Sequence, residues 1–185
     1  MRRQKRQAGE MYYSLFTSAI GTGAVVAGAE GLLEVFPPFG ETKETLLNQL
    51  AARYPSAAGE SSLTRKAADL LAAYFAGVPV AFDLPIDRRG FTPFQWEVYT
   101  AVLAIPYGDV KSYSRVAAEL GRPRAARGIG GAMARNPLPI IIPCHRVVGK
   151  SGGMTGYSAA GGVESKRWLL EMEQRPEGKN RTKTR

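Results

Sequence analysis

Two side chains that often carry chemistry are nearly absent from this sequence: its 185 residues include one cysteine and one histidine. A single cysteine excludes an intramolecular disulfide, so we expect a reducing compartment, the cytoplasm or, in a eukaryote, the nucleus. Residues 1–143 contain neither cysteine nor histidine, which excludes a zinc site built from those ligands in that part of the chain.

Long hydrophobic runs are also absent. No segment approaches the ~20 apolar residues that cross a bilayer. The basic start, Arg2 to Arg6, is followed by Gly9 and Glu10 instead of the apolar core of a secretory signal. We therefore expect no membrane partner and no secretion.

Acidic residues are outnumbered: there are 25 Lys and Arg against 16 Asp and Glu, a net charge of +9. This balance favours a polyanionic partner, nucleic acid first and an acidic membrane surface second. A basic protein without such a partner is the alternative, because the chain ends supply much of the charge. We expect residues 1–9 and 175–185 to be flexible basic arms.

The one thiol and the one imidazole are neighbours, Cys144 and His145, and Arg146 follows them. A free thiol has a pKa near ~8.5, so it needs a base or a positive field to become a nucleophilic thiolate. A lone cysteine is nevertheless more often a small buried apolar residue. Neighbours on a strand also point to opposite faces. Pro143 interrupts the strand-like run 140–142, so we expect Cys144 to begin a turn.

Hydrophobic spacing predicts an α/β domain over residues 10–85 and a linker over 86–90. Thr42 is a candidate N-cap for the first helix of this domain, whose apolar residues recur at helical spacing. The expected strands are 11–20, 24–29, 32–36 and 80–84, and the expected helices are 42–54 and 62–76.

Residues 91–174 predict a second, helix-rich domain. Thr92 and Pro93 begin one helix, with proline at its first position. Helices over 112–120 and 123–134 would form a helix-turn-helix, for which ordinary helix packing is the alternative. Gly128, Gly130 and Gly131 each cost up to about 1 kcal/mol in a helix. They indicate either close packing or a close approach to DNA.

The segment 135–148, RNPLPIIIPCHRVV, resembles the active-site signature of the O6-alkylguanine-DNA alkyltransferases, or methylated-DNA–protein-cysteine methyltransferases. The similarity covers roughly residues 91–173, through Ser112-Tyr113, Arg127 to Met133, Gly156 to Ser158 and Trp168 to Glu173. Residues 1–88 match the family only in size and general pattern. The resemblance implies an α+β chain: a ribonuclease-H-like N-terminal domain, then a winged-helix-like domain with the helix-turn-helix.

The resemblance also implies an activity. The protein would flip O6-alkylguanine, and by family likeness O4-alkylthymine, out of duplex DNA. It would transfer the alkyl group to Cys144 once and irreversibly, without cofactor or metal. We expect a monomer that can bind double-stranded DNA cooperatively. A non-catalytic lesion sensor is the main alternative, although sensors of that type lack the cysteine. A cysteine hydrolase is a third possibility.

The same resemblance assigns roles by position. Cys144 would be the nucleophile, and His145 would act on it through a water and be oriented by Glu173. Tyr113 would assist base rotation and protonate the leaving guanine, and Asn136 would hold the active-site turn. Ordinary surface or half-buried side chains are the alternatives for Glu173, Arg127 and Tyr113. The expected DNA-binding residues are Arg127 (the intercalating arginine), Tyr113, Ser112, Ala126, Gly130, Arg124 and Arg135. The expected pocket residues are Met133, Pro139, Val147, Val148, Tyr157 and Ser158.

Overall fold

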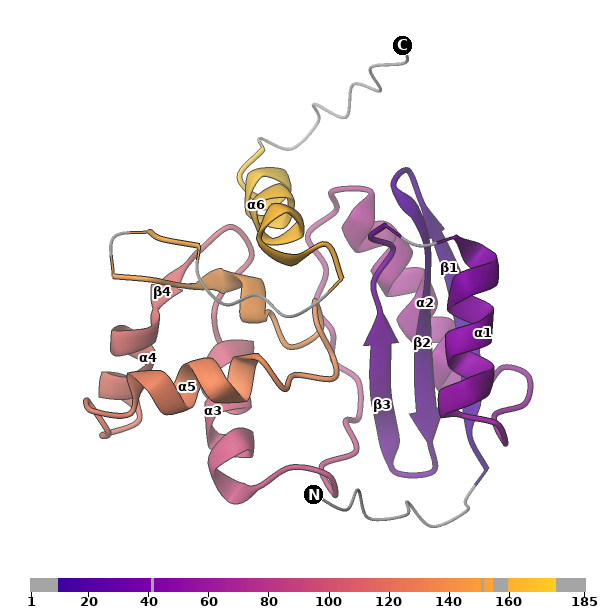
Figure 1. Cartoon of the computed structure of the whole chain (residues 1–185), viewed down its shortest axis with the longest axis horizontal. Coiled ribbons are helices and arrows are strands. Elements are labelled where there is room, and N and C mark those ends of the chain that lie inside the picture. The colour runs from indigo at the N-terminus through magenta and orange to yellow at the C-terminus, as the bar shows by residue number, and fades with distance from the viewer. Residues whose placement is uncertain (1–9, 41, 151, 155–159, 176–185) are drawn as a thin grey trace.

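The N-terminal half is a three-stranded antiparallel sheet in the order β1-β2-β3, seen in the computed structural model (Figure 1). The structure describes residues 10–40, 42–150, 152–154 and 160–175. The strands are β1 (Tyr12–Ser18), β2 (Gly21–Gly28) and β3 (Gly31–Phe36), which confirms the three strands expected there. A Cβ on Gly31 would lie 2.5 Å from the Pro85 carbonyl oxygen, so only glycine fits this turn.

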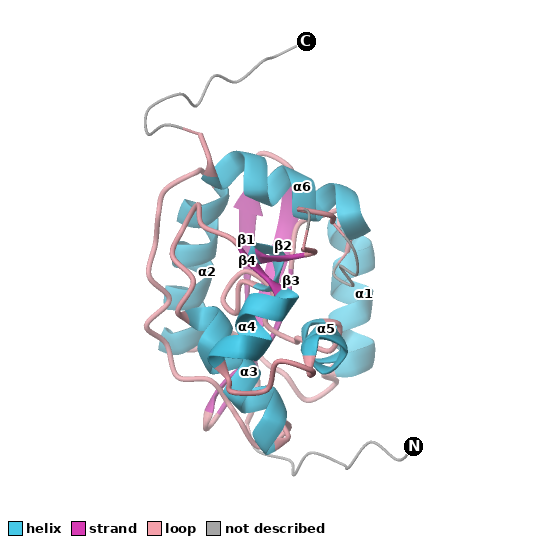
Figure 2. Ribbon diagram, turned by 90° about the vertical axis from the view of Figure 1, so that its left-hand side faces the viewer, coloured by secondary structure: helices cyan, strands magenta, loops and turns pink. Residues whose placement is uncertain are grey.

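Two helices cover opposite faces of this sheet (Figure 2). Helix α1 (Lys43–Arg53) packs through Leu46 and Leu50 against alternate residues of β2, and α2 (Ser62–Phe75) covers the other face. The Thr42 side chain accepts from the backbone N–H of Thr45, so the predicted N-cap is confirmed. Because β2 is buried on both sides, small and β-branched residues fill it.

The strand expected over residues 80–84 is wrong. That segment has no regular secondary structure and pairs with no strand, and only Ile86 bridges to Leu32 of β3. Its apolar residues Val80, Phe82 and Leu84 pack side chains against the core, which explains the strand-like alternation. Backbone contact is limited to the end of the segment, where Leu32 N–H donates to the Pro85 carbonyl at 2.8 Å.

The C-terminal half is built from α3 (Pro93–Leu103), α4 (Tyr113–Glu119), α5 (Ala126–Met133) and α6 (Gly162–Glu173). Thr92 caps α3 with Pro93 in its first turn, as predicted. Helix α5 begins three residues later than expected, because 122–125 form a turn closed by the Ala125 N–H and the Arg122 carbonyl. Gly128 of α5 packs on Phe94, which favours close packing for this glycine.

Two short strands that the sequence did not reveal connect the start of α4 with the reactive segment. Strand β4 (Lys111–Ser112) pairs in parallel with β5 (Val147–Val148), and a 3₁₀ turn, η1 (Cys144–Arg146), precedes β5. Two-residue strands carry too little pattern to be predicted. Their pairing places the start of α4 beside the Cys144 turn.

One apolar core runs through both halves, from Val25 of β2 to Leu169 of α6. The Val35 N–H also donates to the Pro137 carbonyl at 2.9 Å, across the proposed division. The domain boundary at 86–90 stays a prediction. The predicted arms lie outside the described residues, apart from Arg175, and none of the described helices is long and apolar enough to cross a membrane.

Candidate active site

The turn that precedes the cysteine is closed by the side chain of Asn136. Its Nδ2 donates to the Ile142 carbonyl at 2.8 Å, and its Oδ1 accepts from the Leu138 N–H at 3.0 Å. Ile140 has φ of 75°, in the region that β-branched residues avoid. The strand-like interpretation of 140–142 is therefore wrong, because a left-handed residue and the Asn136 hydrogen bonds fold this run into a turn.

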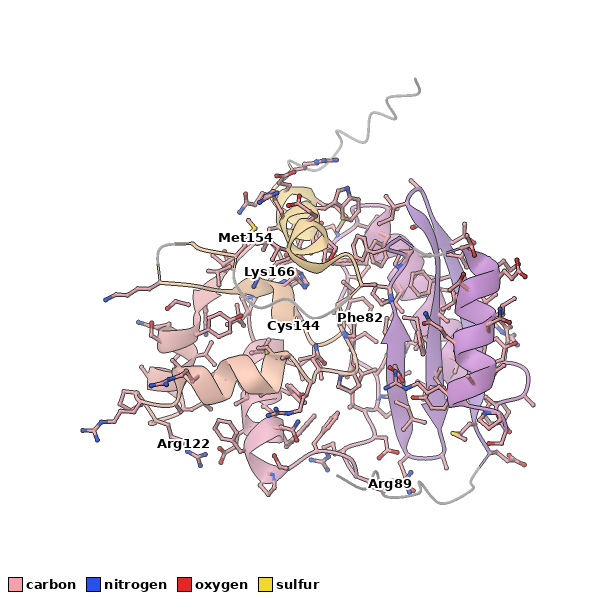
Figure 3. All side chains as sticks on the ribbon, in the orientation of Figure 1. Phe82, Arg89, Arg122, Cys144, Met154 and Lys166 are labelled. Carbon is pink, nitrogen blue, oxygen red and sulfur yellow. The ribbon has the colours of Figure 1, made fainter. Side chains whose placement is uncertain are left out.

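Cys144 begins η1, so the expected turn at this residue is confirmed. The residue is 5% exposed and lies below α6, with Lys166 close above it (Figure 3). Burial raises the pKa of the Cys144 thiol, while the Asn136 amide and the Lys166 ammonium act in the opposite direction. The resting site therefore holds a thiol, with two groups placed to stabilise a thiolate.

His145 is fully buried beside Glu173. Its Nε2 lies 2.8 Å from Glu173 Oε1, while Nδ1 has no hydrogen-bond partner among the described residues. Burial lowers the pKa of His145, and Glu173 partly offsets this. A neutral imidazole held by one nitrogen, with the other available, is the form a general base needs.

Glu173, at the end of α6, is 4% exposed and is the centre of a hydrogen-bond network. Besides His145, it accepts from the Tyr74 hydroxyl at 2.6 Å, the Gly108 N–H at 3.0 Å and the Arg146 guanidinium at 2.9 Å. Burial alone would raise the pKa of Glu173, but hydrogen bonds from His145, Arg146 and Tyr74 lower it far below its usual range. Glu173 is thus an ionised buried carboxylate and not a surface side chain.

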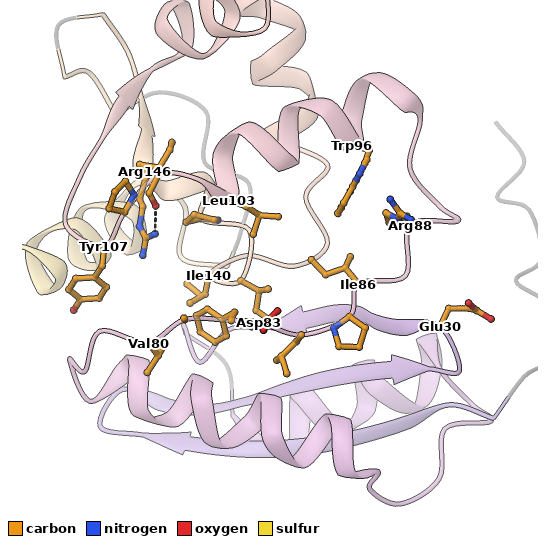
Figure 4. A pocket seen from close by; sticks show the side chains of 18 residues that line it. Glu30, Val80, Asp83, Ile86, Arg88, Trp96, Leu103, Tyr107, Ile140 and Arg146 are labelled. Carbon is orange, nitrogen blue, oxygen red and sulfur yellow. Dashed lines mark hydrogen bonds between the residues drawn. The ribbon is translucent and has the colours of Figure 1, made fainter.

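Arg146 supplies the counterion of this carboxylate from beside a cavity. Its Nη1 donates to the Ile105 carbonyl at 2.7 Å, and its guanidinium lies 5.7 Å from the Tyr107 ring centre. Arg146 and Tyr107 line one end of a cavity of about 780 Å³ between the two halves of the chain (Figure 4). Cys144 is not among the residues that line this cavity, which lies behind the active-site turn.

Sequence reasoning missed Tyr74 and Lys166. Tyr74 was only one apolar position on a predicted helix, and nothing in its spacing indicates a partner 99 residues away. Lys166 is fully buried and donates to the Val147 carbonyl at 2.6 Å. Burial lowers the pKa of Lys166, and Cys144 acts in the opposite direction. A lysine three and four residues before Leu169 and Leu170, on the apolar face of an amphipathic helix, is the one signal that could have indicated it.

Tyr113 stands at the first position of α4, directly after Ser112, whose hydroxyl accepts from the Arg115 N–H. The Tyr113 ring lies 5.8 Å from Lys166 Nζ, and burial raises the pKa of its hydroxyl. The structure thus brings Tyr113, Lys166 and Cys144 together, although they come from α4, α6 and η1.

The exposed arginines around α5 fall into two groups. Arg122 pairs with Glu97 at 3.0 Å, and Arg115 on α4 pairs with Glu119 at 3.0 Å. Arg124, Arg127 and Arg135 are exposed and make no salt bridge within the described part of the chain. Unpaired guanidinium groups are free to meet phosphates. Ala126 and Gly130 are half-buried on the same helix.

The expected pocket residues are placed only in part. Met133, Pro139, Val147 and Val148 are buried around the reactive turn. Tyr157 and Ser158 lie outside the described residues. Among the described residues, no group of three or more His, Cys, Asp or Glu side chains is placed to hold a metal.

Comparison with known proteins identifies the family. A family model described as 6-O-methylguanine DNA methyltransferase, DNA binding domain, matches residues 93–175. A methylated-DNA–protein-cysteine methyltransferase of Methanosarcina acetivorans is 39% identical over 163 residues, which cover 88% of this chain and 98% of that protein. The chain belongs to the methylated-DNA–protein-cysteine methyltransferase family. The resemblance drawn from its sequence is confirmed.

Further members of the methyltransferase family share its sequence or its fold. The Mycobacterium tuberculosis methyltransferase is 52% identical over 108 residues, which cover 58% of this chain and only 64% of that protein. The structure of Mycobacterium tuberculosis OGT in complex with DNA has a TM-score of 0.70 at 39% identity, covering 88% of this chain and 92% of that one. The Pyrococcus kodakaraensis methyltransferase structure has a TM-score of 0.65 at 26% identity, with 88% and 98% covered. The mixed α/β fold is therefore that of the OGT structures.

Proposed function

We propose that this protein repairs alkylated DNA by moving the alkyl group from O6 of guanine to the sulfur of Cys144. One observation carries the proposal: the only cysteine lies beside the only histidine, and that histidine is held by a buried, ionised glutamate. This is a nucleophile, base and orienter set, with the first two on the η1 turn and the third at the end of α6. Membership of the methyltransferase family and the likeness to an OGT structure in complex with DNA support the same activity.

The reaction is a direct displacement in which every proton has a place. His145 takes the thiol proton through a water, and the thiolate of Cys144 attacks the alkyl carbon. The bond between that carbon and O6 breaks, and guanine leaves with a proton from the Tyr113 hydroxyl. Solvent restores that proton to Tyr113 and takes the thiol proton back from His145, so the protons balance. A thioether has no easy hydrolytic exit, so each protein molecule acts once. O4-alkylthymine is the second expected substrate.

DNA is held through α5 and the residues around it. Arg124, Arg127 and Arg135 meet phosphates and the vacated stack, and Ser112, Tyr113, Ala126 and Gly130 line the approach of the backbone. Extrusion of the base costs a few kcal/mol, which insertion of Arg127 offsets. Met133, Pro139, Val147, Val148, Tyr157 and Ser158 surround the flipped base.

The remaining expectations belong to the same proposal. Residues 10–85 form a ribonuclease-H-like domain, supported by the three antiparallel strands and the helices around them. Residues 91–174 form a winged-helix-like domain, supported by the α4–α5 pair beside the β4–β5 pair. The protein works as a monomer in the compartment that holds DNA, the cytoplasm in a bacterium or archaeon.

The test is a count of transferred label. Duplex DNA with a radiolabelled methyl group on O6 of guanine is incubated with limiting protein. We expect label on Cys144 to stop at about one per chain. Cys144→Ala should accept none and still bind the duplex, because the basic surface is elsewhere. Turnover beyond one equivalent would mean a hydrolase, and binding without transfer by the natural protein would mean a lesion sensor.

A further inference from the structure

The active-site network includes one residue from the N-terminal half of the chain. Tyr74 of α2 is fully buried, and its hydroxyl donates to Glu173 Oε1 at 2.6 Å. The same hydroxyl oxygen lies 3.2 Å from His145 Nε2. Tyr74 thus touches both the orienting carboxylate and the base, although it lies 71 residues before His145.

The direction of each hydrogen bond follows from what the groups can donate. A tyrosine hydroxyl has one hydrogen, and an ionised carboxylate only accepts. Burial raises the pKa of Tyr74 well above its usual value, so the hydroxyl stays protonated and donates its hydrogen bond to Glu173. Toward Nε2, both oxygens can then only accept. Nε2 must therefore carry the imidazole hydrogen, which leaves Nδ1 with its lone pair.

The other charged groups near the imidazole do not compete for this hydrogen. Arg146 and Lys166 are donors without acceptor atoms, and both lower the pKa of His145. Arg146 is occupied by Glu173 and the Ile105 carbonyl, and Lys166 donates to the Val147 carbonyl. Apart from the imidazole itself, Tyr74 is the one neutral side chain in the network. Among the described residues, it is also the only contact with Nε2 that comes from the N-terminal half.

We propose that Tyr74 is a positioning residue for alkyl transfer: its hydroxyl clamps Glu173 Oε1 and His145 Nε2–H together and so keeps Nδ1 unprotonated for the thiol. The proposal rests on the function proposed above. The N-terminal half is then part of the reaction site and not only a support for it. Tyr74 acts through Glu173 and His145, both of which its hydroxyl contacts.

The experiment uses the fact that the chain has one histidine. Full-length protein with ¹⁵N-labelled histidine gives NMR signals from His145 alone, and the two nitrogen shifts report the tautomer directly. The reaction rate is measured in parallel with free O6-benzylguanine, which needs no DNA binding. The variant is Tyr74→Phe, which removes only the hydroxyl.

Tyr54→Phe is the matched control. The Tyr54 hydroxyl also donates to a buried glutamate, Glu34, at 2.5 Å, and that glutamate also pairs with an arginine, Arg53, at 2.7 Å. It lies in the sheet and α1 region of the N-terminal half, in a different hydrophobic cluster from Tyr74. Urea unfolding of both variants measures the general effect of losing such a hydroxyl.

We expect the natural protein to show the tautomer with hydrogen on Nε2. Tyr74→Phe should shift and broaden the His145 nitrogen signals and slow transfer about tenfold, a part of the roughly 10²- to 10⁴-fold that a placed general base supplies. Tyr54→Phe should leave both readouts unchanged. The proposal is overturned by hydrogen on Nδ1 in the natural protein, by unchanged His145 signals and rate in Tyr74→Phe, or by equal slowing in both variants. Failure of the natural protein to accept any alkyl group would refute the proposed function, while the tautomer would still decide the place of Tyr74.

Discussion

Replacing Glu173 by glutamine tests whether the buried carboxylate organises the site. Glutamine has nearly the same shape, so Glu173→Gln removes charge without opening a cavity. Three side chains and one backbone amide lose an anionic acceptor: His145, Arg146, Tyr74 and Gly108. Arg146, with 10% of its side chain exposed, is then left without the partner that neutralises it.

The expected loss of stability is large because both charges are buried. Breaking a buried ion pair from one side costs about 3–5 kcal/mol. For a chain of this size about 1 kcal/mol shifts the melting temperature by roughly 2–4 °C, so Tm should fall by about 6–20 °C. The rate of alkyl transfer should fall by roughly 10²-fold or more, because the amide cannot support a positive imidazole.

The pH dependence of stability gives an independent readout. The pKa of Glu173 is lower in the folded protein than in the unfolded chain, where it is near ~4.3. Its stabilising contribution is therefore complete above about pH 5, declines as the pH falls below ~4.3, and is fully lost only as the pH falls through the much lower pKa of the folded protein. Glu173→Gln should show a weaker loss of stability in this acid range than the natural protein.

Glu164→Gln is the control, on the same helix. Glu164 pairs with Arg167 at 2.6 Å, but 78% of its side chain is exposed, and exposed pairs contribute little. Thermal melts and single-turnover transfer rates compare the two variants. Equal, small changes in both would refute the assignment of Glu173 as the organising carboxylate.

Two further variants test the DNA surface and the turn. Arg127→Ala should slow repair of duplex DNA about 10- to 100-fold, because it removes the side chain that fills the vacated stack, yet leave the reaction with free O6-benzylguanine nearly unchanged. Arg65→Ala, which removes an exposed arginine on α2, is the control. Equal slowing of Arg127→Ala on both substrates would make Arg127 a structural residue. Asn136→Ala leaves the Ile142 carbonyl and the Leu138 N–H without their partner and should lower stability by about 1–3 kcal/mol and slow transfer to free base as well as to DNA. Urea unfolding measures the first effect, and an unchanged unfolding midpoint would contradict the role given to Asn136.

Much of the fold follows from local signals in the sequence. Thr42 and Thr92 cap helices that begin where predicted, because a side-chain oxygen that satisfies a free N–H is a local feature. The failures at 80–84 and 140–142 have a common reason. Apolar alternation reports burial of side chains, and it does not report whether the backbone has a strand to pair with. Ile140 is buried in a left-handed turn that no propensity would assign to isoleucine.

The site was predicted as far as the family signature extends. The resemblance supplied the expected roles of four residues that the structure brings together: Cys144, His145, Glu173 and Asn136. Composition alone left Cys144 as a core residue. Tyr74 could not be found in this way, since its partner Glu173 lies 99 residues further along the chain. A contact between the two halves of a chain has no local pattern, and only the three-dimensional structure reveals it.

The raised pKa of Cys144 is compatible with a protein that reacts once. Each pKa unit above the ambient pH reduces the thiolate fraction tenfold, so a buried thiol is protected from chance alkylation or oxidation. An enzyme that turns over gains from a permanently ionised cysteine, whereas a protein consumed by its reaction loses a molecule at every stray encounter. Lys166 and Asn136 can stabilise the thiolate, and the available Nδ1 of His145 can take the thiol proton, when a flipped base is present. It follows that free iodoacetamide should modify Cys144 slowly in the folded protein and that duplex DNA without a lesion should not accelerate this reaction.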